Sequence, residues 1–169
     1  MTAKTLETRG MLDAPPPPAL RFKKILAPID FSPASENATK YALRFAEEFG
    51  AKLTLLHVLE PAPSTSLVAI PGATPFCEID FSTAEKNLRS AVASAGKGKS
   101  ERPSWKIRVG VPSHEIVEAA READVDLIVI ATHGYTGWKH FCIGSTAERV
   151  VRASPCPVLV VREKEHEFC

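Results

Sequence analysis

Short, almost wholly apolar runs are the feature of this sequence that most restricts its fold. The runs at 25–29, 52–59 and 125–131 lack the strict alternation of apolar and polar residues that marks a strand with one face in water. Strands of this kind are buried on both faces, as in parallel sheets that helices cover on both sides. The run 125–131, "VDLIVIA", is the most apolar, and we therefore expect it to be a central strand.

A helical pattern follows the first of these runs. Apolar residues recur at helical spacing from Ala38 to Phe49. Ser32 is placed to cap this helix, Pro33 fits its first turn, and Gly50 can end it. The sequence therefore predicts a strand, a helix and a second strand in succession.

The rest of the chain continues this alternation. Ser82 and Glu85 have the spacing of a capping box and open a second helix. The remaining predicted elements are helices at 82–95, 112–123 and 146–153 and strands at 105–110 and 157–162. With right-handed crossovers, such an order predicts an α/β fold with an open, mostly parallel five-stranded sheet sandwiched by helices.

Length and composition predict one domain with short appendages. The chain has 169 residues, which suits a single domain. We expect a disordered, proline-rich N-terminal tail at 1–21, a single domain at 22–163 with a long loop at 60–79, and a C-terminal tail at 164–169.

Composition also excludes several classes of partner. The formal net charge is +1 and no compact Lys/Arg cluster is present, so the sequence does not predict binding to nucleic acid. No apolar run approaches the roughly 18 residues of a membrane span, and the first residues lack the apolar core of a secretory signal. The four cysteines are widely spaced without a C-x-x-C pair, which favours a reducing compartment. We therefore expect a cytoplasmic protein that contacts neither nucleic acid nor membrane.

The loop that follows the run 125–131 is the candidate site. It reads "ATHGYTGWKHFCIGST" and carries Gly134, Gly144, Ser145 and Thr146 ahead of or at the start of a predicted helix. Glycines permit positive φ and a close approach of the backbone to a ligand, and the unpaired amides of a helix N-terminus favour an anion. In open α/β sheets, ligands lie beyond the carboxyl ends of the strands, where the strand order reverses. The residues alone therefore predict a phosphate-bearing ligand at this end of the sheet.

The same loop has alternative explanations. Ser145 and Glu148 have capping-box spacing, so Ser145 alternatively caps its helix. His133, His140 and Cys142 lack a fourth ligand at a standard spacing, so we expect no metal site, and Cys142 is alternatively a thiol sensor near the helix start. The nucleotide motifs G-x-x-x-x-G-K-[ST] and G-x-G-x-x-G are absent.

Two long stretches together resemble the universal stress protein family. They are "KKILAPIDFSPASENATKYALRFAEEFGAKLTLLHVLE" and "DLIVIATHGYTGWKHFCIGSTAERVVRASPCPVLVVR", and the resemblance runs from Phe22 to Arg162. Members that bind ATP carry the pattern G-x2-G-x9-G-[ST]. Gly134, the nine residues after it and Gly144-Ser145 fit the second half, whereas Ala131 replaces the first glycine, adds a methyl and disfavours positive φ. The resemblance implies a Rossmann-like fold of the adenine nucleotide alpha hydrolase-like type.

The resemblance also implies roles for individual residues. The implied nucleotide positions are Pro28, Asp30, Val58, Ile130, Ala131, Gly134, Gly144, Ser145 and Thr146. The first two would lie beside the adenosine, the third would read the adenine edge through its main chain, the next two would line the ribose end, and the last four would hold the phosphates. Asp30 is alternatively a turn or helix-cap carboxylate, and Val58 is equally a core strand residue.

The function implied by the resemblance is an ATP-binding module of the stress response and its signalling. AMP and ADP are alternative ligands, and Mg²⁺ would accompany the nucleotide. His133, His140 and Asp30 are polar, but none has a partner that marks it as a base, so we assign no catalytic residue and expect hydrolysis to be slow or absent. The alternative, which Ala131 favours, is a nucleotide-independent dimeric interaction protein in the stress response.

The resemblance further implies a homodimer. Family members commonly pair through their last strand, which here runs from Pro157 to Arg162. An apolar edge strand is normally covered or charged. The alternative is that the C-terminal tail covers this edge.

Overall fold

The predicted strands form a single parallel sheet. The structure is a computed structural model that describes residues 20–61, 81–95, 102–132 and 143–162. Its sheet has five strands in the order β3-β2-β1-β4-β5. These are β1 (Lys24–Pro28), β2 (Lys52–Leu59), β3 (Ser104–Val109), β4 (Leu127–Ala131) and β5 (Val158–Val161). The order reverses between β1 and β4, so the α/β prediction is confirmed and the reversal point is located.

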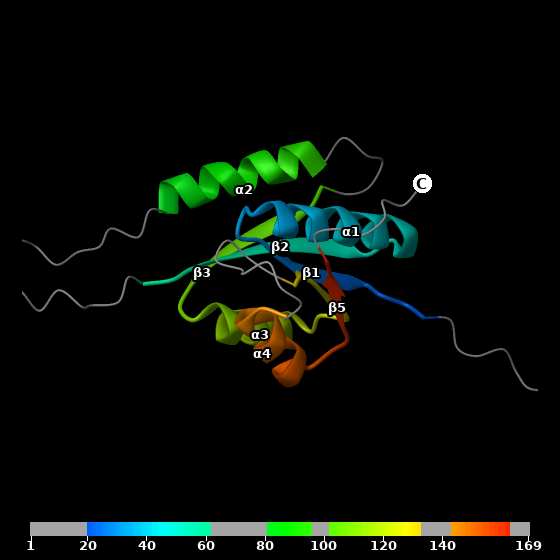
Figure 1. Ribbon diagram of the computed structural model, residues 1–169. Helices are drawn as coiled ribbons and strands as arrows, with labels where there is room; N and C mark the ends of the chain where they lie inside the picture. Colours follow the sequence, from blue (N-terminus) through cyan, green and yellow to red (C-terminus); the bar gives the residue numbers. More distant parts are fainter. Residues whose placement is uncertain (1–19, 62–80, 96–101, 133–142, 163–169) are drawn as a thin grey trace, which may run out of the picture.

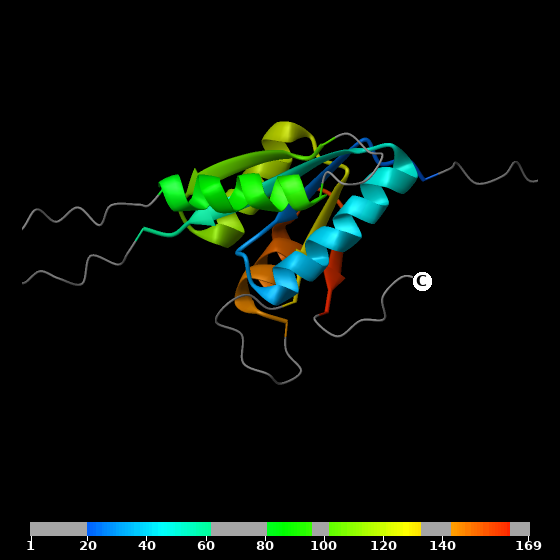
Figure 2. The same ribbon diagram turned by 90° about the horizontal axis from the view of Figure 1, so that it is seen from above.

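The helices lie in two layers, one on each face of the sheet. They are α1 (Pro33–Phe49), α2 (Phe81–Ala95), α3 (Pro112–Ala123) and α4 (Ser145–Ala153). The first two cover one face and the last two the other (Figure 1). Figure 2 looks onto the layer formed by α1 and α2. The predicted tails lie outside the described residues, apart from residues 20 and 21, and so does the predicted long loop, apart from residues 60 and 61.

The first helix begins and ends where its local sequence predicts. The Ser32 side chain is the N-cap and accepts a hydrogen bond of 3.2 Å from the Ser35 amide, with Pro33 in the first turn. Gly50 ends the helix in the left-handed region with a φ of 61°. The three positional expectations for this helix are therefore confirmed.

Two other helix starts differ from the prediction. Helix α2 begins at Phe81, one residue before Ser82, so Ser82 is a helical residue. Helix α4 begins at Ser145, its N-cap is Gly144, and no side chain caps it. The capping box predicted for Ser145 and Glu148 is therefore wrong. Ser145 is already a helical residue, so its amide is one of the unpaired amides of the first turn, and its hydroxyl does not cap them.

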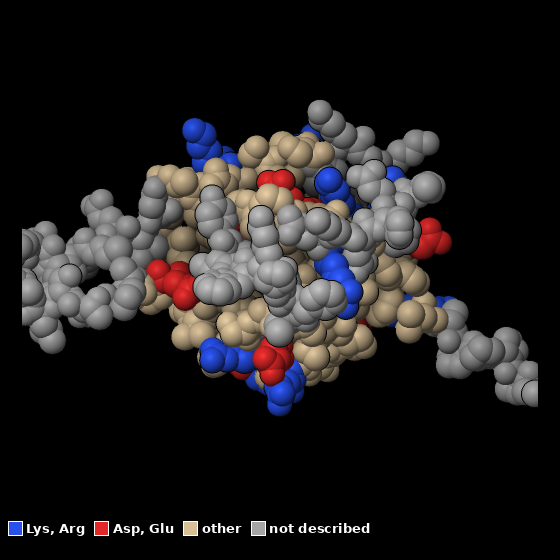
Figure 3. Space-filling model, viewed as in Figure 1, with Lys and Arg blue, Asp and Glu red and all other residues tan. Residues whose placement is uncertain are grey.

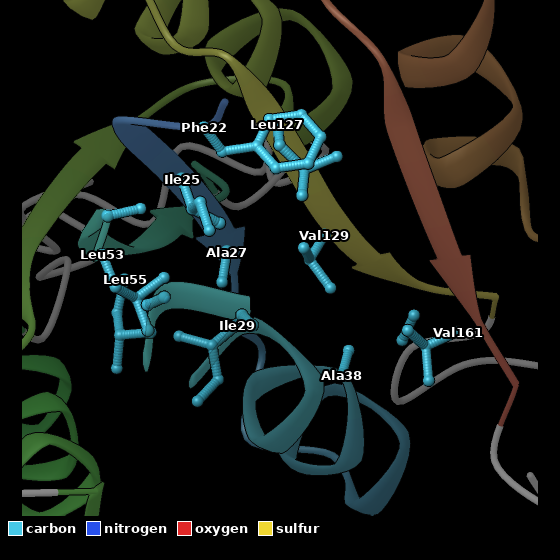
Figure 4. Close-up of a cluster of buried hydrophobic side chains, with 14 of the residues drawn as sticks. Phe22, Ile25, Ala27, Ile29, Ala38, Leu53, Leu55, Leu127, Val129 and Val161 are labelled. Atoms are coloured by element: carbon cyan, nitrogen blue, oxygen red, sulfur yellow. The ribbon is translucent and has the colours of Figure 1, made fainter. Parts of the chain in front are cut away.

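Both faces of the sheet are buried, as wholly apolar strands require. Ile25, Leu55, Val129 and Val161 belong to the cluster beneath α1 and α2 (Figure 4). Alternate residues of the same strands, such as Leu26, belong to the cluster on the other face. All five residues of β4 are buried, yet the central strand is β1 and β4 is its neighbour.

The described surface carries mixed charge. On the face shown in Figure 3, Lys and Arg side chains stand among acidic ones rather than in one continuous basic patch. Within the described ranges, no helix combines the length and apolar character needed to cross a membrane.

Candidate functional site

A cavity opens where the strand order reverses. It has a volume of about 420 Å³ and lies beyond the carboxyl ends of β1, β2 and β4. This volume is within the range of about 300–1,000 Å³ that is typical of small-molecule sites. Every predicted ligand position that the structure describes lines it, namely Pro28, Asp30, Val58, Ile130, Ala131, Gly144, Ser145 and Thr146. Gly134 lies outside the described residues, as do His133, His140 and Cys142.

The chain turns sharply after β1, and Asp30 shapes that turn. Its Oδ1 accepts hydrogen bonds from the Ser32 amide at 3.0 Å and from the Ser32 hydroxyl at 2.6 Å. The Asp30 amide donates to the Ser35 hydroxyl at 3.3 Å. Phe31 follows in the left-handed region with a φ of 63°, which is uncommon for a residue other than glycine. Asp30 therefore has the turn role that the sequence left open, and it also lines the cavity.

The main chain of Val58 faces the side of β2 from which β1 has turned away. The Gly110 amide donates to the Leu59 carbonyl at 3.0 Å, so the main-chain groups of Leu59 face β3. These groups alternate along a strand in a parallel sheet, so those of Val58 face the β1 side. The last main-chain bond between the two strands there joins the Ile29 amide to the Leu56 carbonyl at 2.9 Å. The Val58 side chain packs against the cluster beneath α3 and α4, so its core role and its place at the cavity are compatible.

The N-terminal turn of α4 forms another wall. Ser145, Thr146 and Ala147 line the cavity. The first amides of a helix have no partner within the helix, and its dipole favours an anion. Gly144 has a φ of −61°, so this glycine does not use the positive φ that the sequence allowed for. Ala131 lies in β4 and is not among the residues with positive φ, so its methyl does not conflict with the backbone there.

Besides Ser35 and Glu60, two further polar residues of this cavity, Thr132 and His57, are not among the predicted ligand positions. Thr132 is buried; its amide donates to the Val161 carbonyl and its carbonyl accepts from the Gly144 amide at 2.8 Å. His57 lines the cavity, and its Nδ1 lies 2.7 Å from the Ile29 carbonyl oxygen. His57 and Thr132 share one signal in the sequence that could have predicted their place in the site, because each is a polar residue near the carboxyl end of a buried strand.

The charged side chains of the described lining are the carboxylates of Asp30 and Glu60, and no Lys or Arg is among those residues. An anion in the part of the cavity that the structure describes would therefore meet amides and hydroxyls. Within the same ranges, no group of three or more His, Cys, Asp or Glu is arranged to hold a metal ion.

Comparison with known proteins gives one consistent result. Residues 21–162 match the Universal stress protein family. Universal stress protein MJ0531 of Methanocaldococcus jannaschii is 34% identical over 152 residues, which cover 86% of this chain and 85% of that protein. The structure of universal stress protein UspA from Lactobacillus plantarum superposes with a TM-score of 0.75 at 27% identity, over 85% of this chain and 100% of that chain. A universal stress protein in complex with cAMP shares the fold, with a TM-score of 0.64 at 24% identity over 86% of this chain and 100% of that chain. The parallel sheet with its reversal between β1 and β4, the cavity at that point and these matches together show that the chain belongs to the universal stress protein family.

Proposed function

We propose that this protein binds an adenine nucleotide in the cavity and acts as a nucleotide-dependent module of the stress response and its signalling. The observation that carries the proposal is that the main chain of Val58 and the first turn of α4 face one cavity of about 420 Å³. One wall presents a donor and an acceptor together, and the other presents amides and hydroxyls. This pairing suits a ligand with a heterocyclic edge at one end and an anion at the other.

The adenine end is supported by β2. An adjacent main-chain amide and carbonyl complement the acceptor nitrogen and exocyclic amine of adenine. Pro28 and Ile130 supply apolar walls for the ring and the ribose end. The Asp30 carboxylate lines the cavity and would accept hydrogen bonds from ribose hydroxyls.

The phosphate end is supported by α4. Gly144, Ser145 and Thr146 lie on the cavity wall at the positive end of the helix dipole. Because Asp30 and Glu60 add negative charge to the described lining, a bound Mg²⁺ would offset the charge of a triphosphate. ATP is the proposed ligand, with ADP and AMP as alternatives. A universal stress protein with this fold is in complex with cAMP, and this supports an adenine nucleotide as the proposed ligand.

We assign binding rather than turnover to this site, with hydrolysis slow or absent. Phosphoryl transfer needs a group that orients the attacking water in line with the leaving group. Asp30 instead holds the Ser32 amide and hydroxyl in the turn before α1. The cysteine pattern supports the cytoplasm as the compartment.

Thermal denaturation with and without ATP and Mg²⁺ tests the proposal. A ligand at 100 times its Kd adds about 2.7 kcal/mol to the free energy of unfolding, and the melting temperature should rise by several degrees. Ser145→Asp should abolish the rise while the protein stays folded, because an acidic residue is favourable in a first helical turn but repels phosphate. Ser82→Asp, in the first turn of α2, is the matched control and should keep the rise. If ATP, ADP and AMP leave the melting temperature of the wild-type protein unchanged, the result would instead favour the alternative of a nucleotide-independent interaction protein.

The proposed homodimer uses β5, which is an edge strand of the described sheet. The Ile128 amide donates to the Pro157 carbonyl and the Thr132 amide to the Val161 carbonyl, so the main-chain groups of Val158 and Val160 face away from β4. Val160→Pro removes an outward donor without breaking the bonds to β4. Sedimentation equilibrium should show a wild-type dimer and a folded monomeric variant. A dimer of unchanged stability in the variant would place the interface elsewhere.

A further inference from the structure

His57 makes an unusual contact at the end of β2. Its Nδ1 lies 2.7 Å from the carbonyl oxygen of Ile29. A carbonyl oxygen only accepts, so Nδ1 carries the proton and the imidazole is the donor. The ring also packs against Phe31, with the ring centroids 4.7 Å apart. The His57 side chain therefore contacts both residues that flank Asp30 in the sequence, Ile29 and Phe31.

Without the His57 contact, the Ile29 carbonyl would be the acceptor of the next hydrogen bond between β1 and β2. The register places Pro28 opposite Leu56, so Ile29 comes opposite His57. In a parallel ladder the Ile29 amide bonds to Leu56, and the next bond would join the Val58 amide to the Ile29 carbonyl. The first of these bonds is present at 2.9 Å, and among the described residues it is the last main-chain bond between these strands. The imidazole occupies the acceptor that the Val58 amide would have used.

The same histidine supports the turn that follows. Phe31 has a φ of 63°, and a residue other than glycine keeps this conformation only when its surroundings hold it. The His57 ring on one side and the Ser32 bonds of Asp30 on the other provide that support. Because Asp30 lies between Ile29 and Phe31, its direction into the cavity depends on both contacts.

We propose that His57 is a positioning residue of the nucleotide site. By donating to the Ile29 carbonyl, it keeps the Val58 amide available to bind the adenine. By contacting both Ile29 and Phe31, it holds Asp30 at the cavity. This inference rests on the proposed function. Although His57 lines the cavity, its proposed role acts through Ile29 and Phe31 and needs no direct contact with the nucleotide.

Two substitutions separate the donor from the ring. His57→Phe keeps a ring against Phe31 but has no donor, whereas in His57→Asn the amide nitrogen stands close to the Nδ1 position without the ring. Calorimetry should show ATP binding weakened about tenfold or more in His57→Phe and largely restored in His57→Asn. His114→Asn, at an exposed histidine of α3, is the control and should bind as wild type does. Tripolyphosphate, which lacks the adenine, should not distinguish His57→Phe from wild type.

Hydrogen exchange of the Val58 amide gives a readout that a purely structural role would not change. In wild type this amide should exchange quickly without ligand and slowly with ATP. In His57→Phe it should be protected without ligand, because it can then bond to the Ile29 carbonyl. Imidazole ¹⁵N spectra of wild-type protein should show the proton on Nδ1.

The outcomes separate the two proposals. If wild type binds no adenine nucleotide, the proposed function fails and the role of His57 fails with it. If wild type binds ATP but His57→Phe binds it equally well with an unchanged Val58 amide, only the role of His57 is overturned. If neither variant folds, a proton on Nε2 in the wild-type spectra would overturn it, and a proton on Nδ1 with a Val58 amide protected only by ATP would support it.

Discussion

The carbonyl oxygen of Thr132 accepts a hydrogen bond of 2.8 Å from the amide of Gly144, although eleven residues separate the two. The bond joins the end of β4 to the N-cap of α4. It places the positive end of α4 directly beside the carboxyl end of a buried strand. This bond, together with the packing of Ala147 and Val150 in the cluster beneath α3 and α4, holds one wall of the cavity.

Replacing Gly144 tests that contact. Gly144→Pro removes the amide hydrogen, and proline suits the observed φ of −61°. The free energy of unfolding should fall by about 1 kcal/mol, measured by urea denaturation. Gly144→Ala keeps the amide and suits the same φ, so its stability should stay near wild type. If both variants lose the same free energy of unfolding, the hydrogen bond between the Gly144 amide and the Thr132 carbonyl does not contribute to stability.

Restoring the missing glycine of the family pattern should not improve binding. Ala131 belongs to the buried cluster beneath α1, so its methyl is part of the core. Ala131→Gly should therefore cost about 1 kcal/mol of stability, because glycine in a strand loses packing and gains unfolded-state entropy. ATP affinity by calorimetry should change by less than about twofold. A large gain in affinity would mean that the methyl obstructs the nucleotide.

Gly110 is a position where glycine is required. Its φ is +151°, and an added Cβ would lie 2.9 Å from Oε1 of Glu115. Glu115 pairs with Arg108 at 3.3 Å, so moving its carboxylate away from the added Cβ would disturb this ion pair. Gly110→Ala should destabilise the fold by about 1–3 kcal/mol in denaturant titrations. Adding Glu115→Ala should relieve the clash but not the backbone strain, so the double variant should recover only part of the loss.

Asp126 should make stability depend on pH. Its Oδ2 accepts from the Lys23 amide at 2.7 Å and the Lys24 amide at 2.9 Å. These bonds, with the nearby Lys24 and Lys23 charges, lower the pKa of Asp126 below its usual 3.8. A lowered folded-state pKa contributes stability that is present above the unfolded-state pKa and is lost as pH falls through the folded-state pKa.

The measurement compares wild type with Asp126→Asn across pH. The variant should be less stable at pH values above about 4, and the difference should shrink as the pH falls below that value. Urea midpoints at several pH values would show the convergence. A gap that stays constant down to strongly acidic pH would mean that the carboxylate charge does not stabilise the start of β1.

The sequence determined by itself those features that depend on neighbouring residues. Ser32, Pro33 and Gly50 set the limits of α1 because capping, ring geometry and left-handed φ are local properties. The apolar strands predicted a parallel sheet, because strands that are buried on both faces occur in parallel sheets with helices covering each face. Most of the described ligand positions followed from the expected ends of these strands and from the family resemblance.

Only the tertiary structure decided which groups meet across the sheet. The bond between His57 and the Ile29 carbonyl joins residues 28 positions apart, and nothing local to either predicts it. The contact of Thr132 with Gly144, and the start of α4 one residue earlier than predicted, likewise follow from how β4 and α4 are held together. Strand register, and with it the direction of the Val58 amide, is set by the packing of whole faces against helices, because shifting a strand by one residue would turn its apolar side chains to the wrong face.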